Sequence, residues 1–585
     1  MTGKRAKPRA EAAQPALGRG RLFDRLWRGL LRLPARLGRG LLRSPGRLWR
    51  CLRRLPPGLL LFAMVACLNF ASMSRELSWG DARPIYEVAD SLVTGHGVSV
   101  ATRWPVDADP GRGGRFYAAQ PLLPSLLHVP GAGLSKLLLR LKVGAEVADL
   151  INAAACHVQG GLVGALVVWL FFRLCLRYGA SERTALFASL LLGTGSLIWV
   201  YARYPFSEIA QAACFTGFFL ALARLLKGLQ PRAAIWAGLW AGMLVNTKYV
   251  YALSLPGALA VLLVVHRRDL RRLGLAVLLA GVGLVPGLVM ALVYNFLRFG
   301  SVTKTGYVGV GEVMVENVLL GLWGLLFSPG KSVFLYTPPL VLALLGLPRF
   351  WRSQRATVWA MLATIMPVVL FYCRFPSWPG DWAWGPRYLV FAIPVLLLPA
   401  ISLLASMRWP RRFLALALLA LGIFVQVLGN AFYWDHYLRI ALDVRSHWLG
   451  QPNRSASLTA DKGGYCEGCF EDVYPTVWLA PLQPILGHLW LLRHVPFHHD
   501  WDRASKDAPW RRHTRLVMDS QASYDRVRVD HWLYDMPSHR RSGWLILFGL
   551  VGTGAAAGVL LVIRPRQGPG GRVAISTSSC SGEMS

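Results

Sequence analysis

The stretch LGLAVLLAGVGLVPGLVMALVYNF (273–296) decides the fold class, because it is apolar over its whole length and contains no charged residue. About 20 consecutive apolar residues are enough to cross the hydrocarbon core of a bilayer as an α-helix. The composition agrees, since 54% of the chain is hydrophobic and only 16% is charged. The chain is therefore expected to be an all-α polytopic membrane protein.

Similar apolar runs recur along the chain and predict about twelve transmembrane helices. Two neighbouring runs, 233–247 and 249–266, are short enough to be one kinked helix, which would make the number of spans odd. With the N-terminus inside, however, every inside loop contains arginine, as cytoplasmic loops do, so an even number with both termini cytoplasmic is the consistent prediction. The expected spans are 58–74, 150–173, 183–200, 207–226, 233–247, 249–266, 273–296, 333–348, 356–373, 386–406, 412–432 and 543–563.

The net charge of +34 belongs largely to these inside loops and to the N-terminal segment, residues 1–57, so it does not indicate nucleic-acid binding. An eleven-residue pattern recurs there, in RLFDRLWRGLL (21–31), RLPARLGRGLL (32–42) and RSPGRLWRCLR (43–53). Its arginines follow the helical period, which predicts a basic amphipathic segment on the anionic lipids of the cytoplasmic leaflet. A solvated basic tail that only fixes orientation is the alternative.

Two long outer loops define the remaining organisation of the chain. The expected membrane core, 58–432, includes an outer loop at 75–149, and a second outer loop at 433–542 is expected to form an extracytoplasmic subdomain. The last span, 543–563, precedes a tail, 564–585, whose Ser-rich end is typical of disordered chain. Long loops on one side favour chemistry at the outer face, since loops positioned by a rigid scaffold carry function.

The first outer loop opens with an acidic residue and two amphipathic stretches. Asp81 ends the sequence SWGD (78–81), and the apolar residues up to Leu92 then recur at helical spacing. Two glycines, Gly95 and Gly97, are expected to end this helix. A second apolar stretch follows YAAQPLLP (117–124), and both stretches are expected to be helices lying along the membrane.

The order of these features resembles the membrane-embedded C-type glycosyltransferases, especially the protein mannosyltransferase and aminoarabinose transferase branch (family 39-like). A basic-flanked span is followed by Gly-Asp, then YxxAxSL (86–92), a Gly-rich break, YxxxPL (117–122) and a horizontal helix. The resemblance covers mainly residues 58–270. It implies an enzyme that moves a sugar from a polyprenyl-phosphate carrier to a glycan, lipid or protein acceptor on the non-cytoplasmic face.

The resemblance also assigns roles to individual residues. Asp81 matches the catalytic carboxylate of the first loop, and Glu208 in RYPFSE (203–208) matches a second acidic position, so both are candidate catalytic residues. Lys248 matches a Thr-Lys pair that follows a Gly-rich span. Tyr117, in the YxxxPL motif, is a further candidate for substrate binding.

Two departures from the family pattern bear on metal binding. Ala82 stands where many relatives have Glu, and Gln120-Pro121-Leu122 stands in place of His-Pro-Pro. Both departures weaken the case for a divalent cation held by an acidic pair at the first site, and no other cofactor is predicted.

The chemistry can also be argued from the residues alone. Inverting sugar transfer needs a base for the acceptor and positive charge near the phosphate leaving group. Asp81 is the candidate base, with a helix N-cap as its alternative role, and a helix-start position is the alternative for Glu208. Cations at predicted outer span ends are candidates for phosphate binding, with snorkelling to the headgroups as the alternative: Arg203, Lys248, Lys331 and Arg387.

Two further patterns lie in the predicted outer loops. Asp381, in WPGDWAW (378–384), belongs either to an interfacial aromatic belt or to a sugar-stacking platform. Cys466 and Cys469 form a Cys-x-x-Cys pattern, for which a local disulfide outside the cytoplasm is preferred to half a metal site. An arginine-rich chain with a disulfide on the outside fits a bacterial inner (plasma) membrane.

Two other classes of function stay open. A lipid or polysaccharide transporter or flippase is one, although a twelve-span transporter of the major facilitator type would show two similar halves and a substantial central cytoplasmic loop. A catalytically decayed scaffold of the same fold is the other. The discriminating observation is whether Asp81, Glu208 and Lys248 converge at an outer cavity or line a path through the membrane.

Overall fold

The computed structural model describes residues 55–74, 82–100, 108–140, 145–307, 314, 316–375, 377–380, 383–405, 409–449, 474–496, 500–511, 518–530 and five residues between 551 and 558. The chain divides into two compact units, and the unit Gly58–Val559 contains nearly all of these residues. Several sequence predictions fall outside the described residues: the amphipathic segment 21–53, Asp81, Asp381, Cys466, Cys469 and the tail after 563.

The described chain is almost entirely helical, and its class is the all-α multi-pass membrane protein that the sequence predicts. Within the described residues, six helices are long and apolar enough to cross a membrane, and shorter apolar helices accompany them; the exact number of spans stays a prediction. The six are α5 (Leu122–Leu139), α6 (Ala145–Arg177), α9 (Ser207–Leu225), α12 (Leu270–Phe299), α17 (Arg355–Tyr372) and α20 (Trp409–Ala431). The shorter ones are α3 (Pro57–Ala71), α14 (Val318–Phe327) and the segments Tyr249–Val265 and Arg387–Leu397.

Three predicted spans are interrupted, because a hydropathy pattern does not report where the backbone leaves the helix. The span predicted at 183–200 consists of α7 (Glu182–Gly195) and α8 (Leu197–Ala202), separated by the extended Ser196, whose hydroxyl caps α8. The other two breaks contain proline, which lacks the amide hydrogen a helix needs. They give α15 (Val333–Tyr336) and α16 (Leu340–Ser353), and then η3 (Arg387–Ala392), α18 (Ile393–Leu397) and α19 (Ala400–Leu404).

The short pair of predicted spans forms separate helices rather than one kinked helix. The first is α10 (Pro231–Val245), and the second is a 3₁₀ turn, η2 (Tyr249–Leu253), continued by α11 (Ser254–Val265). Between them Lys248 has an extended backbone, with φ −164° and ψ 129°. The break matters because it places a lysine between two membrane helices.

The two stretches of the first outer loop that the sequence predicts to be helical are helices; that they lie along the membrane stays a prediction, and the second, α5, is also long and apolar enough to cross it. The first, α4 (Ala82–Thr94), ends where Gly95 and Gly97 adopt positive φ angles of 81° and 79°. It packs against α5, which in turn packs against α6. The all-helical prediction misses a small antiparallel hairpin between them, formed by β1 (Ala108–Pro110) and β2 (Phe116–Ala118), with Asp109 opposite Tyr117.

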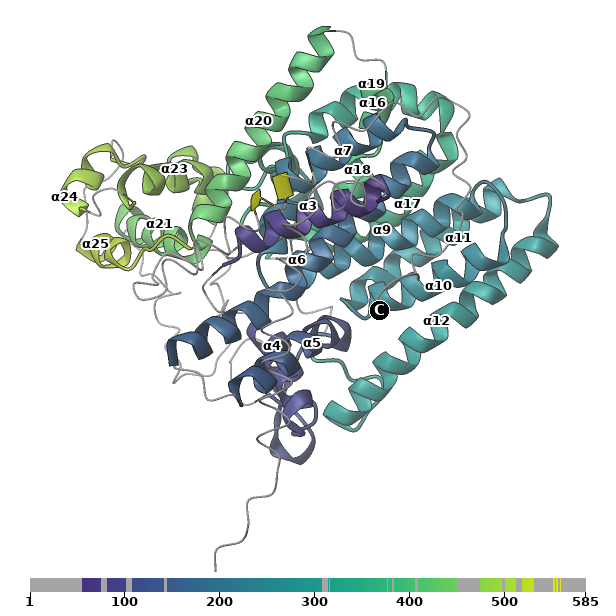
Figure 1. Cartoon of the computed structure of the whole chain (residues 1–585), viewed down its shortest axis with the longest axis horizontal. Coiled ribbons are helices and arrows are strands. Elements are labelled where there is room, and N and C mark those ends of the chain that lie inside the picture. The colour runs from purple at the N-terminus through teal and green to yellow at the C-terminus, as the bar shows by residue number, and fades with distance from the viewer. Residues whose placement is uncertain are drawn as a thin grey trace, which may run out of the picture. The chain divides into compact units, whose positions relative to one another are not determined.

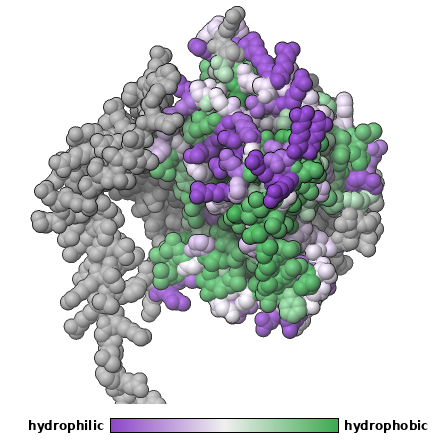
Figure 2. All heavy atoms as spheres, turned by 90° about the vertical axis from the view of Figure 1, so that its right-hand side faces the viewer, coloured by the Kyte–Doolittle hydropathy of each residue, from purple (hydrophilic) through white to green (hydrophobic). Residues whose placement is uncertain are grey.

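Helices α10 and α12 lie side by side (Figure 1) and approach closely through glycine. A Cβ atom on Gly238 would collide with the backbone of Ala280, and one on Gly283 would collide with the backbone of Ile235. Small residues allow such close packing of membrane helices. The opposite face of α12 is exposed and apolar, and Figure 2 shows hydrophobic side chains gathered on this side of the unit, as a lipid-facing surface requires.

Residues after α20 form a group of short helices with a core of its own. They are α21 (Trp434–Leu449), α22 (Tyr474–Trp478), α23 (Pro484–His494), α24 (Trp501–Ala504) and α25 (Met518–Asp525). Their shared core is largely aromatic and includes Tyr437, Trp490, Trp510 and Tyr524. These helices belong to the predicted outer loop 433–542.

Candidate functional site

Three of the predicted site residues converge at one end of the helix bundle. Glu208 lies in the first turn of α9, Lys248 follows α10, and Arg387 begins η3. The Arg387 Nε atom lies 3.9 Å from Glu208 Oε1. Lys248 Nζ lies 5.0 Å from the centre of the Tyr388 ring, which is the residue next to Arg387. We call this group the Glu208 cluster.

A stacked pair of tyrosines holds the two cations of the cluster together. The rings of Tyr372, the last residue of α17, and Tyr388 are 4.1 Å apart and nearly parallel, with an interplanar angle of 4°. Lys248 Nζ lies 5.3 Å from the Tyr372 ring centre, and Arg387 Nη2 donates a hydrogen bond of 3.2 Å to the Tyr388 hydroxyl. Cations are attracted to the faces of such rings. No carboxylate among the described residues forms an ion pair with Lys248, so its charge can act on an anion.

Glu208 is held rigidly at the start of its helix. Its side chain is only 2% exposed, and its position in the first turn of α9 favours a carboxylate, because the helix N-terminus carries partial positive charge. One turn further on, Gln211 donates to Ser207 Oγ at 2.9 Å and accepts a hydrogen bond of 2.5 Å from the Tyr251 hydroxyl. These bonds join α9 to η2 and therefore fix Glu208 relative to the segment that carries Lys248.

Asn246 fixes the position of Lys248 from the other side. Its side-chain amide donates to the carbonyls of Gly242, at 2.8 Å, and of Gly287 in α12, at 2.6 Å. Its own carbonyl accepts a hydrogen bond from the amide of Leu123 at the start of α5. The extended stretch after α10 is thus tied to two neighbouring helices.

Arg203 does not join the Glu208 cluster, although it precedes Glu208 by only five residues. It forms a fully buried ion pair with Asp530, at 3.1 Å, and donates to the backbone carbonyls of Asn430 and Asp530. The Tyr204 hydroxyl donates to the same carboxylate, and Ser74 Oγ donates to it at 2.6 Å. We call Ser74, Arg203, Tyr204 and Asp530 the Asp530 latch. It joins the end of the outer-loop subdomain to the membrane helices.

Lys331 also lies apart from the cluster, but it positions part of it. Its side chain is fully buried, and Nζ donates to the carbonyls of Ala383, at 2.7 Å, and Gly385, at 3.2 Å. These carbonyls lie two to four residues before Arg387. Lys331 therefore holds the loop that leads into η3.

Tyr117 lies in the hairpin of the first outer loop, and its hydroxyl donates to the Arg112 carbonyl at 3.0 Å. Arg298, at the end of α12, is fully buried and donates to the carbonyl of Ala118 at 2.5 Å. Sequence reasoning missed Arg298 as the residue that anchors this hairpin. These bonds hold the hairpin together, and a role of Tyr117 in substrate binding stays a prediction.

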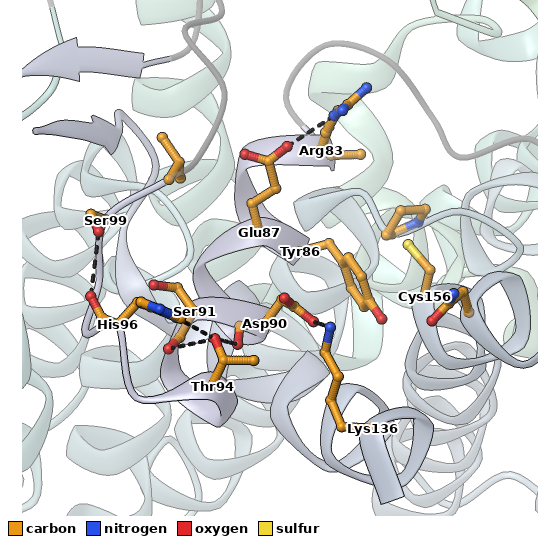
Figure 3. Close-up of a pocket in the computed structure, with 14 residues that line it drawn as sticks. Arg83, Tyr86, Glu87, Asp90, Ser91, Thr94, His96, Ser99, Lys136 and Cys156 are labelled. Atoms are coloured by element: carbon orange, nitrogen blue, oxygen red, sulfur yellow. Dashed lines mark hydrogen bonds and ion pairs between the residues drawn. The ribbon is translucent and has the colours of Figure 1, made fainter. Parts of the chain in front are cut away.

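A separate cavity of about 580 Å³ runs along α4 and is bordered by Ala82 and Pro205. Two ion pairs line it: Arg83 Nε lies 2.9 Å from Glu87, and Lys136 Nζ of α5 lies 2.7 Å from Asp90 (Figure 3). Ala82 follows Asp81 in the chain, and Pro205 precedes Glu208 by three residues. The cavity thus adjoins the two segments that contain the predicted carboxylates.

Sequence reasoning also missed Tyr372 and Tyr388. Aromatic residues at span ends are typical of an interfacial belt, so neither was distinguished from the other tyrosines and tryptophans of the chain. The available signal was that Tyr388 directly follows Arg387. Within the described part of the chain, no group of three His, Cys, Asp or Glu side chains is placed to hold a metal ion.

No protein-family model and no curated protein matches the chain. Among solved structures it is similar to ArnT from Cupriavidus metallidurans bound to undecaprenyl phosphate, with 17% identity, 86% of this chain and 77% of that chain covered, and a TM-score of 0.41. It is also similar to the Archaeoglobus fulgidus oligosaccharyltransferase in complex with Zn and sulfate (12% identity, 87% and 54% covered, TM-score 0.24). A third match is AglB from Archaeoglobus fulgidus with an inhibitory peptide and a dolichol-phosphate (12% identity, 86% and 50% covered, TM-score 0.26).

The chain thus spans about half of each matched oligosaccharyltransferase. The matched proteins belong to the C-type glycosyltransferase class that the sequence resembles. Because every identity is below 25% and every TM-score is below 0.5, these similarities assign no activity, substrate or site to this chain.

Proposed function

We propose that the chain is an integral membrane glycosyltransferase that moves a sugar from a polyprenyl-phosphate carrier to an acceptor at the outer face of the membrane. The observation that carries the proposal is the Glu208 cluster, in which one buried carboxylate and two cations from separate helices meet at one end of the bundle. A lipid-linked sugar has an anionic phosphate, whose bond to the sugar breaks in the transfer. The two cations of the cluster are complementary to this phosphate in charge.

The chemistry assigns a role to each group. In the transfer, the bond between the sugar carbon and the phosphate oxygen breaks, the acceptor oxygen bonds to that carbon, and the acceptor proton passes to a carboxylate. Lys248 and Arg387 would bind the phosphate and stabilise the charge that develops on it as it leaves. Glu208 would orient Arg387 and balance its charge. Asp81 is proposed as the base, on the sequence resemblance alone.

The placement of the cluster favours a transferase over a transporter. Glu208 begins its helix, Lys248 follows the end of its helix, and Tyr372 ends α17, so the group lies at one end of the bundle. A transport path would need polar groups at successive depths along the helices. With the orientation that the basic loops predict, this end faces the outside of the cell membrane.

The test is sugar transfer from a radiolabelled polyprenyl-phosphate sugar in membranes that contain the wild type or a variant. Lys248→Gln should lower transfer by about 10²-fold, because it removes one charge that stabilises the leaving phosphate. Asp81→Asn should lower transfer by a similar factor or more if Asp81 is the base. Lys304→Gln is the matched control, since Lys304 also lies over an aromatic ring, that of Phe299, but is exposed and takes no part in the contacts that define the cluster.

The control should keep wild-type transfer within about twofold, as surface substitutions usually do. Equal transfer by Lys248→Gln and Lys304→Gln would remove the phosphate-binding role of the cluster. Absence of transfer by the wild type with every donor tested would overturn the transferase assignment and favour the transporter or the decayed scaffold.

A further inference from the structure

The cavity along α4 differs from the Glu208 cluster in its balance of charge. Its two cations, Arg83 and Lys136, are each paired with a carboxylate at hydrogen-bonding distance. These pairs are partly exposed, and among the described lining residues their charges balance. An anionic ligand such as a phosphate would therefore gain little here, in contrast to the cluster around Lys248.

An aromatic ring and further polar groups complete the lining. Tyr86 lies between Cys156 and Lys136 in Figure 3, and its ring meets that of His128 edge to face. Burial, together with Cys156 and Asp90, raises the pKa of the Tyr86 hydroxyl, so it stays protonated and can donate a hydrogen bond. Asn152 adds an amide that can both donate and accept.

We propose that this cavity binds a neutral sugar unit of the acceptor, an inference that rests on the proposed transferase function. The paired charges, the Asn152 amide and the Tyr86 hydroxyl can donate to and accept from sugar hydroxyls, and the Tyr86 ring offers a surface to the apolar face of a sugar. The volume of about 580 Å³ lies within the range of small-ligand sites. Pro205 at its border places such a unit beside the segment that carries Glu208.

The experiment is saturation-transfer NMR on the purified full-length chain in detergent, with maltose, cellobiose and mannobiose as separate neutral probes and glucuronic acid as an anionic probe. Asp90→Asn should weaken binding of the probe that binds wild type by about tenfold, the equivalent of one hydrogen bond to a charged group. Asp435→Asn is the matched control, because Asp435 also forms an ion pair of 2.7 Å, with Arg439, outside the cavity. Thermal unfolding of both variants checks that each is folded.

A neutral disaccharide that binds wild type and Asp435→Asn, and binds Asp90→Asn about tenfold more weakly, supports the proposal. The proposal is overturned if none of the three neutral probes binds, or if the wild type, Asp90→Asn and Asp435→Asn bind them equally. Tighter binding of glucuronic acid than of the neutral probes also overturns it. Because binding needs no transfer, the two proposals fail separately. Specific sugar binding without transfer from any donor supports sugar binding by the cavity and overturns the transferase function. Transfer without sugar binding supports the transferase function and overturns sugar binding by the cavity.

Discussion

The Asp530 latch makes a prediction about stability that can be worked from its contacts. Asp530 is fully buried, and its carboxylate accepts hydrogen bonds from Ser74 and Tyr204 while it forms an ion pair with Arg203. Replacement by asparagine keeps the shape of the side chain but removes its charge. The guanidinium of Arg203 then remains buried without an opposite charge.

Removal of one partner of a buried ion pair costs about 3–5 kcal/mol, because the remaining charge is left without compensation in a medium of low dielectric constant. Asp530→Asn should lie near the lower end of this range, since the amide oxygen can still accept hydrogen bonds and two backbone carbonyls still accept from Arg203. By comparison, loss of the exposed pair between Asp435 and Arg439 should cost only about 0.3–0.5 kcal/mol.

Membrane proteins often unfold irreversibly, so the assay is the half-life of the folded, detergent-solubilised protein at a fixed temperature, measured by size-exclusion chromatography. If most of the loss is expressed in the unfolding rate, Asp530→Asn should shorten the half-life at least about tenfold. The double variant Arg203→Met with Asp530→Asn should recover part of it, because the uncompensated charge is gone while the asparagine oxygen still accepts from Ser74 and Tyr204. Equal half-lives for Asp530→Asn and Asp435→Asn would refute the reasoning.

The remaining stability predictions concern one histidine and two glycines. His488 is fully buried, and burial lowers its pKa from 6.5 to about 4, so the unfolded chain binds more protons between these values. The free energy of unfolding should be highest above about pH 6.5 and fall by roughly 3 kcal/mol as the pH approaches 4. His488→Gln should flatten this pH dependence, as measured by thermal unfolding at pH 7.5 and 5. Gly238→Ala should destabilise by about 1–3 kcal/mol, because its Cβ would collide with α12. Gly274→Ala, on α12 itself but facing open space, should instead be neutral or stabilise by up to about 1 kcal/mol. A Gly238→Ala variant as stable as Gly274→Ala would contradict the packing argument.

The fold class could be predicted from the sequence because a bilayer imposes a simple rule on length and hydrophobicity. The runs at 207–226, 273–296 and 356–373 correspond to α9, α12 and α17 within a few residues. The breaks inside other runs could not be predicted in the same way. Ser196 interrupts a helix through its backbone conformation and the capping bond of its side chain, and neither alters mean hydropathy.

The site could be predicted in part. A charged side chain at membrane depth is energetically costly and therefore tends to have a function. This argument selected Lys248 and Arg387 as candidates, together with Arg203 and Lys331. The argument could not distinguish Lys248 and Arg387, which join the cluster, from Arg203 and Lys331, which do not, because the difference depends on contact residues distant in sequence. Arg203 is neutralised by a residue 327 positions away, whereas Lys248 meets tyrosines that the sequence does not distinguish from an interfacial belt.

One segment of six residues, Arg203–Glu208, connects the three features. Arg203 and Tyr204 belong to the Asp530 latch, Pro205 borders the α4 cavity, and Glu208 belongs to the cluster. Tyr204 and Phe206 also pack against Trp434, at ring distances of 4.5 and 5.4 Å, so the first residue of α21 supports the segment as well. A substitution in the latch should therefore displace Pro205 and Glu208 together. Such a variant should lose sugar binding and disturb the Glu208 cluster in parallel, whereas Asp90→Asn should weaken sugar binding and leave the cluster in place.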